Sequence, residues 1–257
     1  MTTSQTSGRL SDGELSRLLS LVQDADSVEL KLTLPESDRQ SALAALEVDP
    51  LDARIRQVYF FDTPELSLFD HGVVARARRT QGKPDDSVVK LRPVVPSELS
   101  NDLRKDENFV VEVDAMPGGY VCSASYKGSV RTGRVKETVA QGHPLDRLFS
   151  KQQRVFFADH APEGVKLDSL SILGPITVLK LKVAPDGFAR KMAVELWNYP
   201  DGSRILELST KCAPSEAFQV AAESRAFLSD RGVNLEGEQE TKTKTALYYY
   251  AATMRAS

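Results

Sequence analysis

Cysteine, histidine and tryptophan are scarce in this sequence of 257 residues, which contains two, three and one of them, respectively. Two cysteines are too few for a disulfide framework or a thiolate metal site, and their scarcity favours an intracellular, cytoplasmic protein. The three histidines lack the spacing of metal ligands, so they predict no histidine metal centre. The sequence therefore lies outside the disulfide-rich and zinc-finger classes.

Long apolar runs and a strong net charge are also missing. The net charge is −3, with 41% hydrophobic and 27% charged residues, which is ordinary for a globular protein. We expect neither a membrane partner nor a specific nucleic-acid partner, because nothing in this balance attracts either one. Residues 1–25 are predicted to be a tail with a short helix at 13–22, and residues 26–257 a single domain. A homodimer stays open, because it has no sequence signature here.

What the chain does contain is a series of strand-like segments with one apolar face and one charged face. In residues 26–34, Val28 and Leu30 alternate with Glu29 and Lys31. Like charges on one strand face repel each other, so a face that serves only solubility tends to mix signs. The charged faces of later segments instead double one sign, in the pairs Arg76 and Arg78, Lys90 and Arg92, Glu112 and Asp114, and Lys180 and Lys182.

Two architectures fit this alternation. An antiparallel sheet with one packed and one solvated face explains any single strand. A closed barrel of about eight strands, with the charged faces inside, explains the whole set and leaves room for one small ligand. Buried cations then need a compensating anion, and arginine and lysine favour phosphate. Carboxylates beside a phosphate chain need a divalent cation, of which Mg²⁺ and Mn²⁺ fit best.

Helices are expected between the strands. Residues 36–48 and 213–233 have helical spacing, and residues 120–150 predict helices with a break near 142–144 because they lack period-two alternation. Residues 152–158 are predicted to be a strand.

The motifs that carry these charges resemble those of the CYTH family, the triphosphate tunnel metalloenzymes. The opening strand is similar to the family's E-x-E-x-K signature, residues 58–79 to its Y-F-D-T-P…R-x-R block, and residues 88–92 to its K-x-R strand. The resemblance covers about residues 26–250. It implies an α+β fold in which an eight-stranded antiparallel β-barrel forms a closed tunnel with a charged lumen, flanked by helices.

The resemblance also implies roles for residues. Glu29 and Lys31 would be catalytic. The resemblance assigns phosphate binding to Lys31, Arg76, Arg78, Lys90, Arg92, Arg154 and Lys242, with Lys244 as the alternative to Lys242, and it assigns Mg²⁺ or Mn²⁺ to Glu29, Glu195 and Glu207. The strand alternation adds Lys180 and Lys182 as phosphate-binding candidates and Glu112 and Asp114 as metal-ligand candidates, and Arg190 is a further phosphate-binding candidate.

Two positions depart from the family pattern. Ser27 stands where the first Glu of E-x-E-x-K belongs, and Ser209 where the second Glu of a late E-x-E pair belongs. Each serine removes a negative ligand, so a second metal ion should bind less well. Glu112 and Asp114 are candidates to compensate for this loss.

The function implied is metal-dependent hydrolysis of a triphosphate: inorganic triphosphate, thiamine triphosphate or a nucleoside triphosphate. Two alternatives remain: a non-catalytic polyphosphate- or nucleotide-binding module with a degenerate metal site, and a class IV adenylate cyclase. Turnover that depends on Mg²⁺ or Mn²⁺ would separate an enzyme from the binding module.

Overall fold

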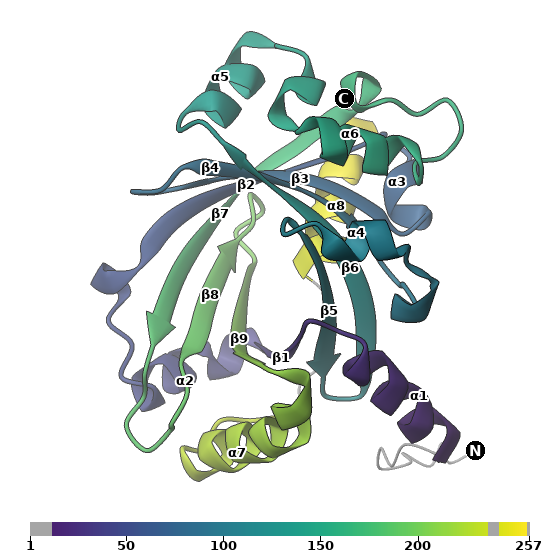
Figure 1. Ribbon diagram of the computed structural model, residues 1–257. Helices are drawn as coiled ribbons and strands as arrows, with labels where there is room; N and C mark the ends of the chain where they lie inside the picture. Colours follow the sequence, from purple (N-terminus) through teal and green to yellow (C-terminus); the bar gives the residue numbers. More distant parts are fainter. Residues whose placement is uncertain (1–11, 236–241, 256–257) are drawn as a thin grey trace, which may run out of the picture.

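The computed structural model describes residues 12–235 and 242–255, and within them nine strands form one closed barrel accompanied by eight α-helices (Figure 1). The strands are β1 (Ser27–Leu34), β2 (Arg54–Asp62), β3 (Val73–Thr80), β4 (Asp85–Leu91), β5 (Phe109–Met116), β6 (Gly119–Val130), β7 (Ser171–Val183), β8 (Met192–Asn198) and β9 (Arg204–Cys212). The helices are α1 (Asp12–Gln23), α2 (Arg39–Ala45), α3 (Ser67–Asp70), α4 (Asn101–Lys105), α5 (Arg134–Gln141), α6 (Lys151–Ala158), α7 (Ala217–Asp230) and α8 (Lys242–Arg255).

The strands follow the order β1-β5-β6-β4-β3-β2-β7-β8-β9 around the barrel, and β9 pairs with β1 to close it. The predicted closed α+β barrel is confirmed. The predicted count of eight strands is wrong, because the described residues contain nine. The purely antiparallel arrangement is also wrong, since β1 and β5 run parallel, with Glu29 opposite Asp114.

Two segments have the opposite structure from the one predicted. Residues 119–130 form strand β6 instead of a helix. The prediction failed because small side chains on the inner face of the strand, such as Ser123 and Ser125, conceal the alternation of apolar and charged residues. Residues 151–158 form helix α6 instead of a strand. Ser150 and Gln153 make a capping box at its start, which satisfies free backbone N–H groups.

Helix α6 is fixed to the outside of the barrel by a buried side chain. The amide nitrogen of Gln153 donates hydrogen bonds to the carbonyl oxygens of Ser87 (3.1 Å) and Tyr126 (3.0 Å), on strands β4 and β6. A β-carbon at Gly128 would lie 2.4 Å from Oε1 of Gln153, so only glycine permits this approach. The helix therefore covers an outer face.

The apolar faces of the strands point outward, under the helices. Val111 and Val113 of β5 belong to a buried cluster that includes Phe156 and Phe157 of α6. A second cluster, which includes Leu32 of β1, packs against helices α2 and α7. Each large apolar side chain buried in this way stabilises the fold by about 1.5–3 kcal/mol. The main core thus lies outside the barrel, and the interior is left for other residues.

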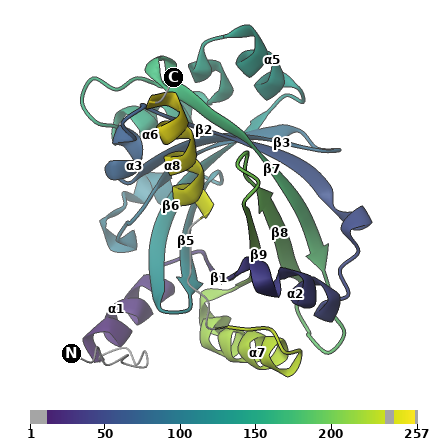
Figure 2. The same ribbon diagram turned by 180° about the vertical axis from the view of Figure 1, so that it is seen from behind.

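Helix α8 is different, because it packs on the inner face. Ala246, Leu247 and Ala251 are buried against inward-facing side chains of the barrel, including Val58 and Ile176. Figure 2 shows α8 beside the barrel strands. One end of the interior is therefore closed by apolar packing. No helix in the described ranges is both long enough and apolar enough to cross a membrane.

Candidate functional site

The rest of the barrel interior is charged. Strands β1, β3, β4, β5, β8 and β9 direct their second face into it, as the alternation predicted. A cavity of about 100 Å³ lies there, next to the first turn of α8. The charged residues that line it are Lys31, Arg76, Lys90, Arg92, Asp114, Glu207 and Lys242.

Asp114 is the most buried acid of the cavity, with a side chain only 1% exposed. Its Oδ1 accepts a hydrogen bond from Lys31 Nζ at 2.7 Å, and its Oδ2 lies 3.5 Å from Lys90 Nζ and also contacts Arg92. Burial alone would raise the pKa of Asp114, but Lys90, Lys31 and Arg92 outweigh it and hold the pKa well below its usual range. The carboxylate is therefore ionised throughout the physiological range.

Lys31 lies between two acids, since its Nζ is also 3.1 Å from Glu29 Oε2. Burial lowers the pKa of Lys31, but Asp114 and Glu29 raise it well above its usual value. An ammonium held in this way is a fixed positive charge. It fits electrostatic stabilisation of an anion and does not fit proton transfer.

Two other cations of the cavity are poorly compensated. Lys90 forms one ion pair within the described ranges, with Asp114 at 3.5 Å, and burial, opposed by Asp114, lowers the pKa of Lys90 to about 8. Arg76 forms no ion pair with any described residue, and burial and the neighbouring Arg78 lower the pKa of its guanidinium. Both are charges that an incoming anion would stabilise.

A second group of acids lies on β8 and β9, where Glu195 is directly opposite Glu207. Lys242 Nζ contacts both carboxylates, at 2.8 Å from Oε2 of Glu195. Lys180 Nζ donates to Oε1 of Glu195 at 2.5 Å. Burial raises the pKa of Glu195, but Lys242 and Lys180 lower it well below its usual range.

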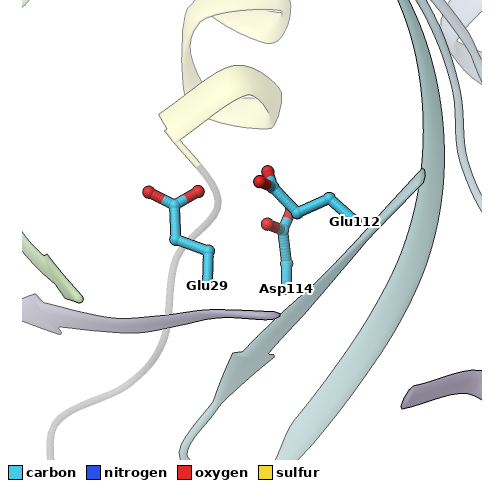
Figure 3. Close-up of side chains that lie close together, drawn as sticks. All are labelled: Glu29, Glu112 and Asp114. Atoms are coloured by element: carbon cyan, nitrogen blue, oxygen red, sulfur yellow. The ribbon is translucent and has the colours of Figure 1, made fainter. Parts of the chain in front are cut away.

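The carboxylates of Glu29, Glu112 and Asp114 gather on adjacent strands β1 and β5, as Figure 3 shows. One oxygen of each lies within 4.8 Å of the others. Carboxylate oxygens at this spacing fit one hard divalent cation such as Mg²⁺ or Mn²⁺, with small adjustments of the side chains. We refer to these three residues as the β1/β5 triad.

The two serines at departing positions hold these acids in place. Ser27 Oγ donates to Glu112 Oε2 at 3.2 Å, and Ser209 Oγ donates to Glu29 Oε1 at 2.9 Å. Both hydroxyl groups are thus hydrogen-bond donors to carboxylates of the β1/β5 triad.

Several predicted phosphate-binding residues are not brought to the cavity. Arg154 lies exposed on α6, outside the barrel, and donates to the carbonyl oxygens of Asp146 and Phe149. Arg190 pairs with Glu216 and Glu223, just before and within α7. Lys182 and Lys244 are exposed. Arg78 and Lys180 face the interior, but Arg78 is already paired with Asp86 at 2.7 Å.

The sequence reasoning missed two interior residues, Arg56 and Trp197. Arg56 Nη1 lies 3.4 Å from Glu195 Oε1, and Trp197 Nε1 donates to Glu195 Oε2 at 3.0 Å. Arg56 shares its strand face with Arg54, so the doubled positive charge that marked other strands was an available signal here. Its contact with Glu195 depends on the register, because strand β7 lies between β2 and β8.

Comparison with known proteins finds likeness in structure alone. No protein-family model matches the chain, and no curated protein matches its sequence. A protein from Bacillus halodurans, a candidate adenylate cyclase, superposes with a TM-score of 0.60 at 12% identity, over 86% of this chain and 97% of its own. A candidate adenylyl cyclase from Hippeastrum with a dominant triphosphatase activity superposes with a TM-score of 0.63 at 18% identity, over 86% and 95%.

The chain has the tunnel fold of these proteins. The resemblance to the CYTH family that the motifs indicated is confirmed at the level of the fold. At such low identity the likeness carries no residue roles, so the chemistry of this site depends on its own residues.

Proposed function

We propose that this protein hydrolyses a short triphosphate inside the barrel, with Mg²⁺ or Mn²⁺ as cofactor, in a single tunnel domain that begins near residue 26. The observation that carries the proposal is Arg76, which forms no ion pair with any described residue and faces a cavity shared with Lys90 and Arg92. A buried cation without a partner is costly unless an anion binds there. The triphosphatase activity of the Hippeastrum protein supports the same class of substrate.

In this proposal the basic residues hold the phosphate chain. Arg76 and Arg92 offer planar guanidinium groups that suit bidentate contacts to phosphate oxygens, while Lys31 and Lys90 add point charges. A divalent cation at the β1/β5 triad would neutralise part of the phosphate charge.

Water would attack the terminal phosphorus in line, as in phosphoryl transfer generally. Glu29 lies at the edge of the β1/β5 triad, where its carboxylate can orient that water. Positioning and charge neutralisation supply the rate enhancement, since no described residue has the environment of a strong general base. A small-molecule triphosphate is thus the proposed partner. The scarcity of cysteine supports a cytoplasmic location.

A non-catalytic module that binds polyphosphate is the second candidate. Ser27 and Ser209 favour it, because each leaves the tunnel one carboxylate short. Such a module would bind triphosphate through Arg76 and release nothing.

The test is a panel of substrates: inorganic triphosphate, thiamine triphosphate, ATP and longer polyphosphate. Orthophosphate and pyrophosphate release would be measured with Mg²⁺, with Mn²⁺ and with chelator. Glu29→Gln and Arg76→Ala should each lower turnover by on the order of 10²- to 10³-fold. Arg79→Ala is the matched control, because Arg79 lies on the outer face of the same strand and bonds to Gln57.

Orthophosphate release that requires metal and is lost in both variants would establish the hydrolase. Pyrophosphate from ATP without orthophosphate would mean a cyclase. No turnover on any substrate, with triphosphate binding that is lost in Arg76→Ala, would mean the binding module.

A further inference from the structure

A second cavity lies outside the barrel, where helix α7 covers the outer faces of strands β1 and β9 (Figure 1). Its volume is about 260 Å³, against about 100 Å³ for the charged cavity. Its walls are mainly large apolar side chains, those of Leu30, Leu32, Met116, Met192, Leu208 and Leu228. We refer to this space as the α7 cavity. Lys31 and Met116 line both cavities, so the two spaces are neighbours on either side of the barrel wall.

The α7 cavity interrupts a packed apolar layer. Leu32, Met192, Leu208 and Leu228 belong to one buried cluster, and each is between 1% and 6% exposed. Protein interiors are close-packed, and a void among apolar side chains costs stability in proportion to its volume. Water stabilises such a space poorly, because a buried water molecule needs two to four polar partners. The cavity is therefore suited to an apolar group.

The size of the cavity limits what can occupy it. An apolar cavity of about 150 Å³ in another protein takes up benzene. By the same ratio, the α7 cavity has room for an apolar body of roughly ten carbon atoms. Met116 and Met192 are flexible side chains that adapt to ligands of different shape. An occupant of this size is a small molecule, since a folded partner could not enter.

Two neighbouring residues of α7 supply polar groups. Arg225 lines the cavity, is exposed and forms no ion pair with any residue in the described ranges. Ser224 also lines the cavity, and its Oγ is buried without a hydrogen-bond partner in the described part of the chain. An unpaired hydroxyl of this kind costs free energy that a bound oxygen atom would recover.

The charge of this lining selects an anion. Among the described residues that line the α7 cavity, none is an aspartate or a glutamate. The guanidinium of Arg225 is thus the single charge at the outer edge, and its planar donors match a carboxylate. The ammonium of Lys31 is already held by Asp114 and Glu29 in the barrel interior.

We propose that the α7 cavity binds an amphipathic carboxylate of medium chain length. Its chain lies among the leucines and methionines, and its carboxylate lies beside Arg225 and accepts a hydrogen bond from Ser224. This binding site is separate from the charged cavity. The inference goes beyond the proposed function and does not rest on it.

The experiment is calorimetric titration of the full chain with octanoate, hexanoate and 1-octanol. One octanoate should bind per chain. Hexanoate should bind on the order of tenfold more weakly, because each methylene group that enters an apolar cavity strengthens binding by about fourfold. Arg225→Gln should weaken octanoate by about three- to fivefold and leave the affinity for 1-octanol within about twofold, because the alcohol carries no charge.

Three further variants test where the ligand lies. Ala221→Phe places a ring in the α7 cavity and should weaken octanoate and 1-octanol by at least about tenfold. Ala222→Phe is the matched control, because Ala222 is exposed at the next position of α7. Arg76→Ala should bind octanoate as tightly as the unmodified chain, since Arg76 lines the charged cavity.

Several outcomes would overturn the inference. These are the absence of octanoate binding, equal affinities for hexanoate and octanoate, or an unchanged octanoate affinity in Arg225→Gln or Ala221→Phe. Loss of octanoate binding in Arg76→Ala would place the ligand in the barrel interior and overturn it as well. The proposed function is tested separately, by phosphate release. Thermal melting of each variant checks folding, and the comparison of chain lengths keeps the test decisive if Ala221→Phe does not fold.

Discussion

The two ends of the barrel interior are built from the same strand faces, yet one end is apolar and the other charged. On β7, Ile176 and Val178 belong to the apolar end, and Lys180, two residues later, belongs to the charged end. On β8, Trp197 belongs to the apolar end and Glu195 to the charged end. The boundary between the two ends therefore lies at the same position along the barrel axis on these neighbouring strands.

This difference shows how a charged interior can be tolerated. Buried charges cost free energy unless they are paired, and Arg76 is not paired within the described chain. The apolar end, with α8 packed into it, contributes the stability that offsets this cost. We expect substitutions at the apolar end to change stability and substitutions at the charged end to change binding and catalysis.

The largest effect on folding is expected at the apolar end. Ile176→Ala removes a side chain that is 0% exposed, so the free energy of unfolding should fall by about 2–5 kcal/mol. Denaturant unfolding measures it. Ile55→Ala is the matched control, since Ile55 is 50% exposed on β2 and should change stability by less than about 0.5 kcal/mol. Equal losses of unfolding free energy in the two variants would contradict the conclusion that the apolar end of the barrel interior stabilises the fold.

At the charged end, an apolar substitution should raise the free energy of unfolding instead of lowering it. Arg76→Met replaces a half-buried cation, which forms no ion pair in the described chain, with an apolar side chain, so the free energy of unfolding should rise by about 1–3 kcal/mol while triphosphate binding is lost. Thermal melting and calorimetric binding measure the two properties on one sample. A variant that loses stability together with binding would show that Arg76 supports the fold.

Acid should lower the free energy of unfolding through Glu195, which lies where the apolar and charged ends of the barrel interior meet. The pKa of Glu195 lies well below its usual value of 4.5, so the folded state binds this proton less readily than the unfolded state does. Its contribution to stability is present above about pH 4.5 and is lost as the pH falls through the lowered pKa, at about 1.4 kcal/mol per unit. Glu195→Gln should make the decline of unfolding free energy below about pH 5 shallower. An unchanged slope would assign the acid sensitivity to other carboxylates.

The smallest effect is expected where the two ends meet in one side chain. Trp197 packs in the apolar cluster while its Nε1 donates to Glu195. Trp197→Phe keeps a ring and removes the donor, so stability should fall by about 1–2 kcal/mol with most of the loss from the hydrogen bond. A double-mutant cycle with Glu195→Gln measures the coupling between the two residues. Additive effects would mean that the hydrogen bond contributes nothing.

Alternation in the sequence predicted which strand faces point inward, because one side of each strand had to pack under helices. Glu29, Lys90 and Glu112 were identified in this way. Position along the barrel axis has no such signature, so Lys182 was grouped with Lys180 although it lies exposed at the end of its strand. Arg154 was misplaced for another reason: its helix was taken for a strand.

Strand β6 escaped prediction because its inner face carries small residues. Ser123 and Ser125 provide neither charge nor bulk, so the alternation was invisible. The pairing of acids with particular cations was also beyond the sequence. It depends on register, as in Glu195, which lies opposite Lys180 on one side and Glu207 on the other.

The pairing of β1 with β9 joins distant parts of the chain, with Val28 opposite Cys212 and Leu34 opposite Leu206. A chain emerging from the ribosome cannot close its barrel until most of it has been synthesised, and such long-range pairing is intrinsically slow to form. The opening strand, which carries Glu29 and Lys31, can pair with β5 earlier, but its pairing with β9 requires almost the whole chain. Until translation has passed residue 212, the growing polypeptide has no enclosed space in which to hold an anion.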